Sequence, residues 1–162
     1  MKLYIKQKPF SWRDKFSVKD ENGTDRYFVE GELFSLGKRL HVTDPAGREV
    51  MTIVQKLWTF RHTYEVYREG KLLAVVRKEF SLLTPRYTVE GVDWQAEGSF
   101  MGLEYAVNAG SRQVAVIHKA FMSWGDSYEL DIACKEDELP ALAVVLAIDC
   151  AVAQQNSAAS NP

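Results

Sequence analysis

Apolar and polar residues alternate along most of the chain, and three segments repeat one pattern. Each segment has a turn glycine, an apolar run ending in lysine, an aromatic residue two positions later and a return run with Tyr-x-Val or Tyr-x-Leu. The three segments cover residues 47–66, 70–89 and 110–130. A period of two is typical of a half-buried β-strand, and glycine suits a tight turn. Each segment therefore predicts a β-hairpin.

The return runs also predict which side chains face the core. Residues two apart lie on the same face of a strand. The apolar and aromatic members expected on the inner face are Tyr64 and Val66, Tyr87 and Val89, and Tyr128 and Leu130. The residues between them, expected on the outer face, are Glu65, Thr88 and Glu129.

The end of the chain has a different pattern. Nearly every residue from 139 to 153 is apolar, so a helix over about 139–154 would have no polar face and should be buried on all sides. The run is shorter than the roughly 20 residues that a membrane-spanning helix needs, and Asp149 interrupts it. Pro140 suits a first helical turn. Residues 156–162 carry little apolar content and are expected to form a disordered tail.

Together these patterns predict a mainly β fold. Further strands are expected near residues 3–5, 16–18, 27–34, 39–43 and 103–107, for a total of about twelve. Many strands with short turns and no intervening helices favour a closed antiparallel barrel. A barrel of that size has a lumen too wide for its wall side chains to fill, and an apolar helix would plug it. We expect one domain over residues 1–155 with the helix as its core.

Composition restricts the possible partners. The chain has 162 residues, 46% hydrophobic and 26% charged, with a formal net charge of −2, as in an ordinary soluble protein. That charge gives no global attraction to nucleic acid, so no nucleic-acid partner is expected. The first residues have no secretory signal pattern, which favours a cytoplasmic location, with peripheral membrane association as a further possibility. Cys134 and Cys150 lack metal or disulfide spacing and are expected to be buried.

Candidate catalytic residues are sparse. The histidines, His41, His62 and His118, all fall in strand-like runs, and no Gly-x-Ser-x-Gly motif occurs. We therefore expect no enzyme activity, no metal site and no cofactor. The aromatic residues expected to pack around the core, rather than to stack on bases or anchor in a membrane, are Phe10, Trp12, Trp58, Trp94 and Trp124.

Asp149 is the single acidic residue within the apolar run 139–153. An acid in a dry helix must find a partner or stay protonated. One hypothesis places Asp149 near the helix end at the barrel mouth, bonded to water, a tyrosine hydroxyl, a tryptophan N–H or a cation. The other makes it a titrating group or a ligand anchor. We expect Asp149→Leu to leave the fold intact.

Basic residues recur at related positions. Lys56, Lys78 and Lys119 end the apolar runs of the three hairpins, and further basic residues, Lys38, Arg39 and Arg48, lie on either side of the turn at 44–47. If several of them emerge on one rim, they would offer charges to lipid phosphates or to another anion. The alternative is that they keep apolar strands soluble and unpaired.

The chain resembles the LURP-one-related family, whose domain is similar to the tubby C-terminal domain and to phospholipid scramblases. The resemblance rests on residues 4–7, 28–32 and 38–40, the hairpin repeats and the terminal apolar helix. It implies a twelve-stranded barrel around a central hydrophobic helix. Tubby-like relatives bind phosphoinositide headgroups through lysine and arginine, and scramblases act at membranes with calcium. No motif for either activity matches here, so no site residue is carried over.

Three hypotheses for function follow. The first is a non-enzymatic binding module whose surface meets a membrane lipid, a protein or a regulatory ligand. The second is a scramblase-like membrane protein whose helix leaves the barrel. The third is a small-ligand carrier, or an enzyme, with a pocket at the barrel mouth. Fold alone does not choose among them.

Overall fold

The computed structural model describes residues 1–6, 15–32, 36–82, 84–99, 104–122 and 125–159. Within them lie twelve strands, one short 3₁₀ helix and one α-helix. The strands are β1 (Lys2–Lys6), β2 (Phe16–Asp20), β3 (Asp25–Gly31), β4 (Arg39–Thr43), β5 (Glu49–Gln55), β6 (Thr63–Arg68), β7 (Lys71–Lys78), β8 (Arg86–Glu90), β9 (Trp94–Ser99), β10 (Glu104–Ala109), β11 (Arg112–Met122) and β12 (Gly125–Ile132). The 3₁₀ helix (Lys135–Asp137) leads into α1 (Glu138–Ala159).

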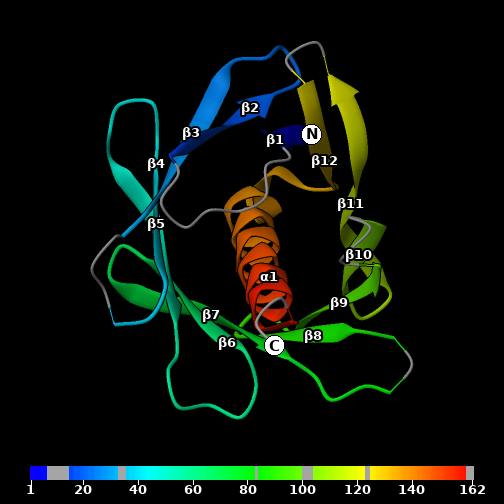
Figure 1. Cartoon of the computed structure of the whole chain (residues 1–162). Helices are drawn as coiled ribbons and strands as arrows, with labels where there is room; N and C mark the ends of the chain where they lie inside the picture. The colour runs from blue at the N-terminus through cyan, green and yellow to red at the C-terminus, as the bar shows by residue number, and fades with distance from the viewer. Residues whose placement is uncertain (7–14, 33–35, 83, 100–103, 123–124, 160–162) are drawn as a thin grey trace.

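The strands form one closed antiparallel barrel, as the sequence predicts. Each strand pairs with the next along the chain, and β1 pairs with both β2 and β12. Tyr4, for example, lies opposite Lys19 on one side and Glu129 on the other. Closure leaves no free strand edge that could pair with another chain. Figure 1 shows α1 running through the ring of strands.

The simple up-and-down order gives the barrel two different ends. The connections after β2, β4, β6, β8 and β10 are tight turns and lie at one end, which we call the turn end, and α1 begins there. The strands β1, β3, β5, β7, β9 and β11 end at the opposite end of the barrel, which we call the loop end, and most of them are separated from the next strand by more residues than at the turn end. At the turn end Glu69 (φ 50°) and Gly70 (φ 73°) both adopt positive φ, as a type I′ hairpin turn requires.

The core consists of the inner faces of the strands and nearly the whole of α1. The predicted inward pairs, such as Tyr64 (1% exposed) and Val66 (0%), are buried. Residues 141–148 of α1 are each at most 1% exposed, which confirms a helix that is buried on all sides. The helix therefore supplies the apolar volume that wall side chains alone would leave empty.

The helix is longer than the sequence pattern suggests. It begins at Glu138 and ends at Ala159, whereas the pattern places its end near residue 154 and a disordered tail after it. Residues 156–159 are thus helical. Alanine has the highest helix propensity, and continuing the helix satisfies carbonyl groups that would otherwise lack donors. Residues 160–162 of the expected tail lie outside the described residues.

An ion pair holds the start of α1 to the wall at the turn end. Glu138 is 6% exposed. Its two carboxylate oxygens accept hydrogen bonds from Arg26 Nε at 2.9 Å and Nη2 at 3.2 Å. The Tyr27 hydroxyl donates a further hydrogen bond at 2.8 Å. A negative side chain is also favourable at the positive N-terminal end of a helix.

Candidate functional site

The structure brings five of the six predicted basic residues to the loop-end half of the barrel. Lys38 and Arg39 lie at the start of β4, Lys56 directly follows β5, Lys78 ends β7, and Lys119 lies in the half of β11 nearest the loop end. The sixth, Arg48, lies at the turn end, where it forms an ion pair with Asp44 at 2.7 Å. Arg48 is therefore separate from the other five.

Exposed apolar side chains gather at the same loop end. Six large ones lie in its connections: Leu36, Leu57, Trp58, Phe60, Phe80 and Leu82. Trp58 and Phe60 are fully exposed, and both lie in the connection between β5 and β6. Among the described residues only Met1 and Leu72 are large exposed hydrophobics elsewhere. A concentration of exposed apolar side chains at one place marks an interaction surface.

The prediction that the tryptophans pack around the core is confirmed for Trp94 and wrong for Trp58. Trp94 is 5% exposed and belongs to the core. Trp58 has positive φ (61°) and lies beyond the end of β5, so its side chain extends away from the barrel. Phe10, Trp12 and Trp124 lie outside the described residues. A sequence signal for Trp58 exists, since the segment after Lys56 does not alternate as a strand does.

The charges of the two ends are opposite. The difference lies in the numbers of acidic and basic residues among the described side chains of the connections and of the strand residues next to them. At the loop end basic residues outnumber acidic ones: Lys6, Lys15, Lys38, Arg39, Lys56, Arg61, Lys78 and Arg86 against Glu32, Glu79 and Glu104. At the turn end acidic residues outnumber basic ones: Asp20, Glu21, Asp25, Asp44, Glu49, Glu69, Glu90, Asp93, Glu136, Asp137 and Glu138 against Lys2, Arg48, Arg68, Lys71, Arg112 and Lys135. The small net charge conceals this separation.

Several loop-end cations influence one another. Burial lowers the pKa of Lys38 to about 8. Burial also lowers the pKa of His62, and the positive charges of Lys78 and Lys38 lower it further. Lys56 is partly neutralised by Glu65 at 2.9 Å, and Arg61 by Glu79 at 3.0 Å. Further carboxylates pair with Lys15, Arg39 and Arg86, so five of the eight loop-end basic residues have an acidic partner and much of the positive charge of this rim is compensated.

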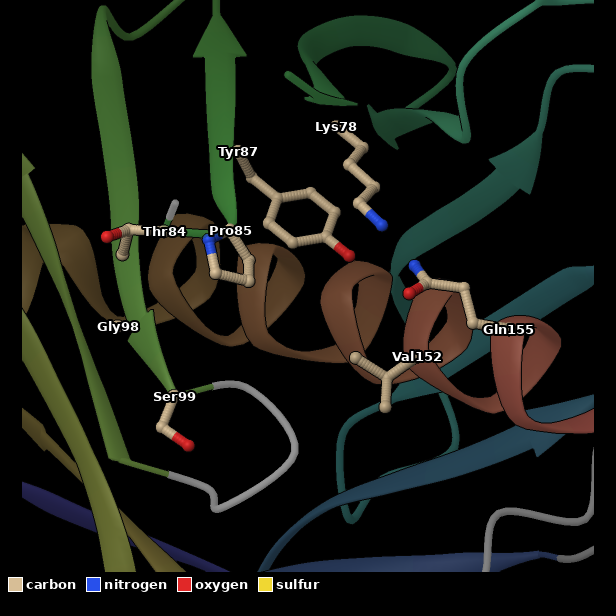
Figure 2. A pocket seen from close by; sticks show the side chains of 8 residues that line it. All are labelled: Lys78, Thr84, Pro85, Tyr87, Gly98, Ser99, Val152 and Gln155. Atoms are coloured by element: carbon tan, nitrogen blue, oxygen red, sulfur yellow. The ribbon is translucent and has the colours of Figure 1, made fainter. Parts of the chain in front are cut away.

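A cavity of about 470 Å³ opens beside α1 at this end. Figure 2 shows its lining from β7, β8, β9 and the last turns of the helix. The lining residues are Lys78, Thr84, Pro85, Tyr87, Gly98, Ser99, Val152 and Gln155. The polar ends of Lys78, Tyr87 and Gln155 point toward one another across it (Figure 2).

Gly98 shows how closely β9 and β10 approach at the cavity wall. Its φ of 142° lies in a region that side-chain-bearing residues rarely adopt. A Cβ added there would lie 2.7 Å from both the Glu104 carbonyl oxygen and the Tyr105 Cα. Glycine is therefore required by the backbone at this point, where the sequence offers no particular reason for it.

Four tyrosines line the barrel interior around the second half of α1: Tyr64, Tyr87, Tyr105 and Tyr128. They come from alternate strands, β6, β8, β10 and β12. The Tyr64 hydroxyl donates to Gln154 Oε1 at 2.9 Å. The Tyr128 hydroxyl donates to Asp149 Oδ2. Asp149 and Gln154 of the helix thus each accept a hydrogen bond from a phenol of the wall.

Asp149 has the kind of partner that its structural hypothesis expects, a tyrosine hydroxyl. Burial raises the pKa of its carboxyl group to about 7, although the hydrogen bond from Tyr128 acts in the opposite direction. Its side chain keeps a partly accessible surface. Burial also raises the pKa values of Tyr105 and Tyr128 well above the usual range, and the negative charge of Asp149 adds to the effect.

The cysteines and histidines make no further site. Cys150 is buried as predicted, but Cys134 is exposed because it lies in the turn-end connection between β12 and the 3₁₀ helix. The sequence pattern predicts His62 in a strand, whereas it lies in the connection before β6. His41 and His118 lie on strands and contact Glu49 (2.6 Å) and Glu129 (3.2 Å).

The described residues contain no group of three or more histidine, cysteine, aspartate or glutamate side chains placed to hold a metal ion. No helix among them combines the length and the apolarity needed to cross a bilayer.

Comparison with known proteins identifies relatives of the whole barrel. The uncharacterised protein YxjI of Bacillus subtilis (strain 168) is 34% identical over 149 residues, which cover 92% of each chain. An X-ray structure of a protein from Arabidopsis thaliana has the same fold, with a TM-score of 0.61 at 21% identity, over 90% of this chain and 88% of that one. The model of the LURP-one-related family matches residues 1–149, from β1 well into α1. The chain therefore belongs to the LURP-one-related family.

Proposed function

We propose that the chain is a non-enzymatic binding module whose loop end attaches to an anionic membrane surface. The observation that carries the proposal is the coincidence of exposed aromatic residues and a basic rim at one end of a rigid barrel. The acidic turn end would face away from the lipid.

The apolar part of the proposed interface has side chains suited to the bilayer boundary. Trp58, Phe60 and Phe80 project from two neighbouring connections, those after β5 and β7. Tryptophan and phenylalanine favour the layer between lipid headgroups and acyl chains. Insertion would remove from water the apolar surface that the free barrel leaves exposed.

The electrostatic part supports the same orientation. The basic residues of the loop end would attract anionic headgroups, each contributing on the order of 1 kcal/mol near such a surface. Ion pairs such as Lys56–Glu65 reduce this attraction. The helix is held at its start by Arg26 and near its end by Tyr64, which favours a barrel that keeps its helix when bound.

Vesicle sedimentation tests the proposal. We expect the protein to bind vesicles of mixed phosphatidylcholine and phosphatidylglycerol at low salt, and to bind more weakly as salt screens the charges. The double variant Trp58→Ser, Phe60→Ser should lower the partition constant at least tenfold, since complete burial of each side chain would contribute about 1.5–3 kcal/mol and even half-burial of both would exceed the roughly 1.4 kcal/mol that a tenfold change requires.

Leu72→Ser is the matched control, because Leu72 is an exposed apolar residue near the turn end. It should leave the partition constant unchanged. Failure of the unaltered protein to bind anionic vesicles at low salt would overturn the proposal, and a protein partner would then be the better explanation of the exposed aromatic residues.

A further inference from the structure

We infer that the cavity beside α1 binds a small single-chain amphiphile of the fatty-acid class, whose carboxylate lies between Lys78, Tyr87 and Gln155. This inference adds a soluble ligand to the loop end. It does not require that the loop end bind a membrane.

The shape and lining of the cavity suit a mainly apolar molecule. Its volume of about 470 Å³ lies within the range of about 300–1,000 Å³ that is usual for small-molecule pockets. Val152, Pro85 and the ring of Tyr87 provide apolar walls. The polar atoms converge at one place rather than being spread over the walls (Figure 2). That arrangement matches a ligand with one polar end and an alkyl chain.

A buried donor at the convergence point requires an acceptor. Gln155 Nε2 is buried, and no acceptor among the described residues meets hydrogen-bond geometry with it, although the amide is near enough to the Tyr87 hydroxyl to oppose the rise that burial causes in the pKa of Tyr87. Figure 2 shows the Lys78 ammonium group on the facing side, and it also can only donate. A buried donor without an acceptor is costly, so an oxygen atom between these two nitrogens would stabilise both.

Strand register explains why Lys78 faces the cavity. Lys78 lies opposite Tyr87 in the β7–β8 pair, as Gln55 lies opposite Tyr64 in the β5–β6 pair, so Lys78 is on the inner face of the barrel. Lys56 lies one residue beyond Gln55, in the connection after β5, and forms an ion pair with the outer-face residue Glu65. No carboxylate of the described residues lies within ion-pair distance of Lys78.

The number of charges indicates a carboxylate. Among the described residues that line the cavity, Lys78 alone is charged, and one cation matches a monoanion. Phosphate groups, with a larger charge, are usually held by several basic side chains or by backbone N–H groups. A carboxylate can accept one hydrogen bond from the Lys78 ammonium group and another from the Gln155 amide.

Isothermal titration with decanoate, kept below its micelle concentration, tests the inference. We expect saturable binding with one site per chain, and no binding of decanol or acetate, which lack the charge or the alkyl chain. Lys78→Met should weaken decanoate binding at least tenfold, and Gln155→Leu should weaken it severalfold. Lys56→Met is the matched control and should bind decanoate as the unaltered protein does.

The outcomes separate this inference from the proposed membrane binding. Absence of saturable decanoate binding, or equal losses in Lys56→Met and Lys78→Met, would overturn the inference and leave Lys78 with a role in solubility alone. Tighter binding of decyl phosphate than of decanoate would also overturn the assignment of a carboxylate. Trp58→Ser, Phe60→Ser should keep its decanoate affinity even when it no longer sediments with vesicles.

Discussion

Replacing Glu138 by alanine is expected to lower the free energy of unfolding by about 3 kcal/mol. The substitution removes the buried carboxylate that joins the start of α1 to Arg26 and Tyr27. Breaking one side of a buried ion pair is strongly destabilising, and here the Arg26 side chain is 43% exposed, which places the effect at the lower end of the usual range. Denaturant unfolding followed by circular dichroism would measure the change.

Glu136→Ala is the matched control for this experiment. Glu136 is an exposed acid two residues earlier, in the 3₁₀ helix, and no ion pair is described for it. Its substitution should change the free energy of unfolding by less than about 0.5 kcal/mol. If Glu138→Ala were equally mild, the ion pair with Arg26 would not be what holds the helix in the barrel.

Replacing Asp149 by leucine is expected to make the protein more stable above pH 7 by about 2 kcal/mol. The carboxyl group has a pKa of about 7 in the folded protein and 3.8 as the reference for the unfolded chain. The folded state therefore binds the proton more tightly, and stability falls as pH rises from about 4 to about 7. A pKa difference of this size corresponds to about 4 kcal/mol of unfolding free energy lost above pH 7, and a leucine side chain, which does not ionise, would avoid this loss.

The gain in stability of Asp149→Leu is reduced because the Tyr128 hydroxyl loses its hydrogen-bond acceptor. A buried hydroxyl without an acceptor costs about 1–3 kcal/mol, so the variant should be no more stable than the unaltered protein near pH 4.5. Thermal unfolding of both proteins between pH 4.5 and pH 8 gives the difference in their stability at each pH. Other titrating groups, such as His62, are present in both proteins, so their contributions cancel in this difference. A difference that does not change with pH would contradict a raised pKa of Asp149.

The two ends of the barrel suggest how the molecule divides its tasks. The turn end carries tight hairpins and the ion pair of Glu138, so it contributes mainly to stability. The loop end carries the cavity, the exposed aromatic residues and most of the predicted basic positions. Binding residues are often placed on loops at one end of a rigid scaffold, because loops tolerate change in sequence without loss of the core.

Local patterns in the amino-acid sequence are enough to predict the barrel and its central helix. Alternation with a period of two reports which residues of a strand face inward, and the apolar run at 139–153 leaves no polar face for solvent. These are local patterns, so they can be read without knowing the neighbours in space. The tyrosines of the return strands, such as Tyr64 and Tyr87, were assigned to the inner face on this basis, and both are buried.

Which distant residues meet depends on the three-dimensional arrangement of the strands. Lys38 and Lys78 are forty positions apart and reach one rim because β4 and β7 point in opposite directions within the closed barrel. The apolar character of Trp58 predicts a place in the core, yet its position beyond the end of β5 leaves it exposed. The cavity and the partners of Asp149 depend likewise on strand order and register, which are long-range properties that no local pattern encodes.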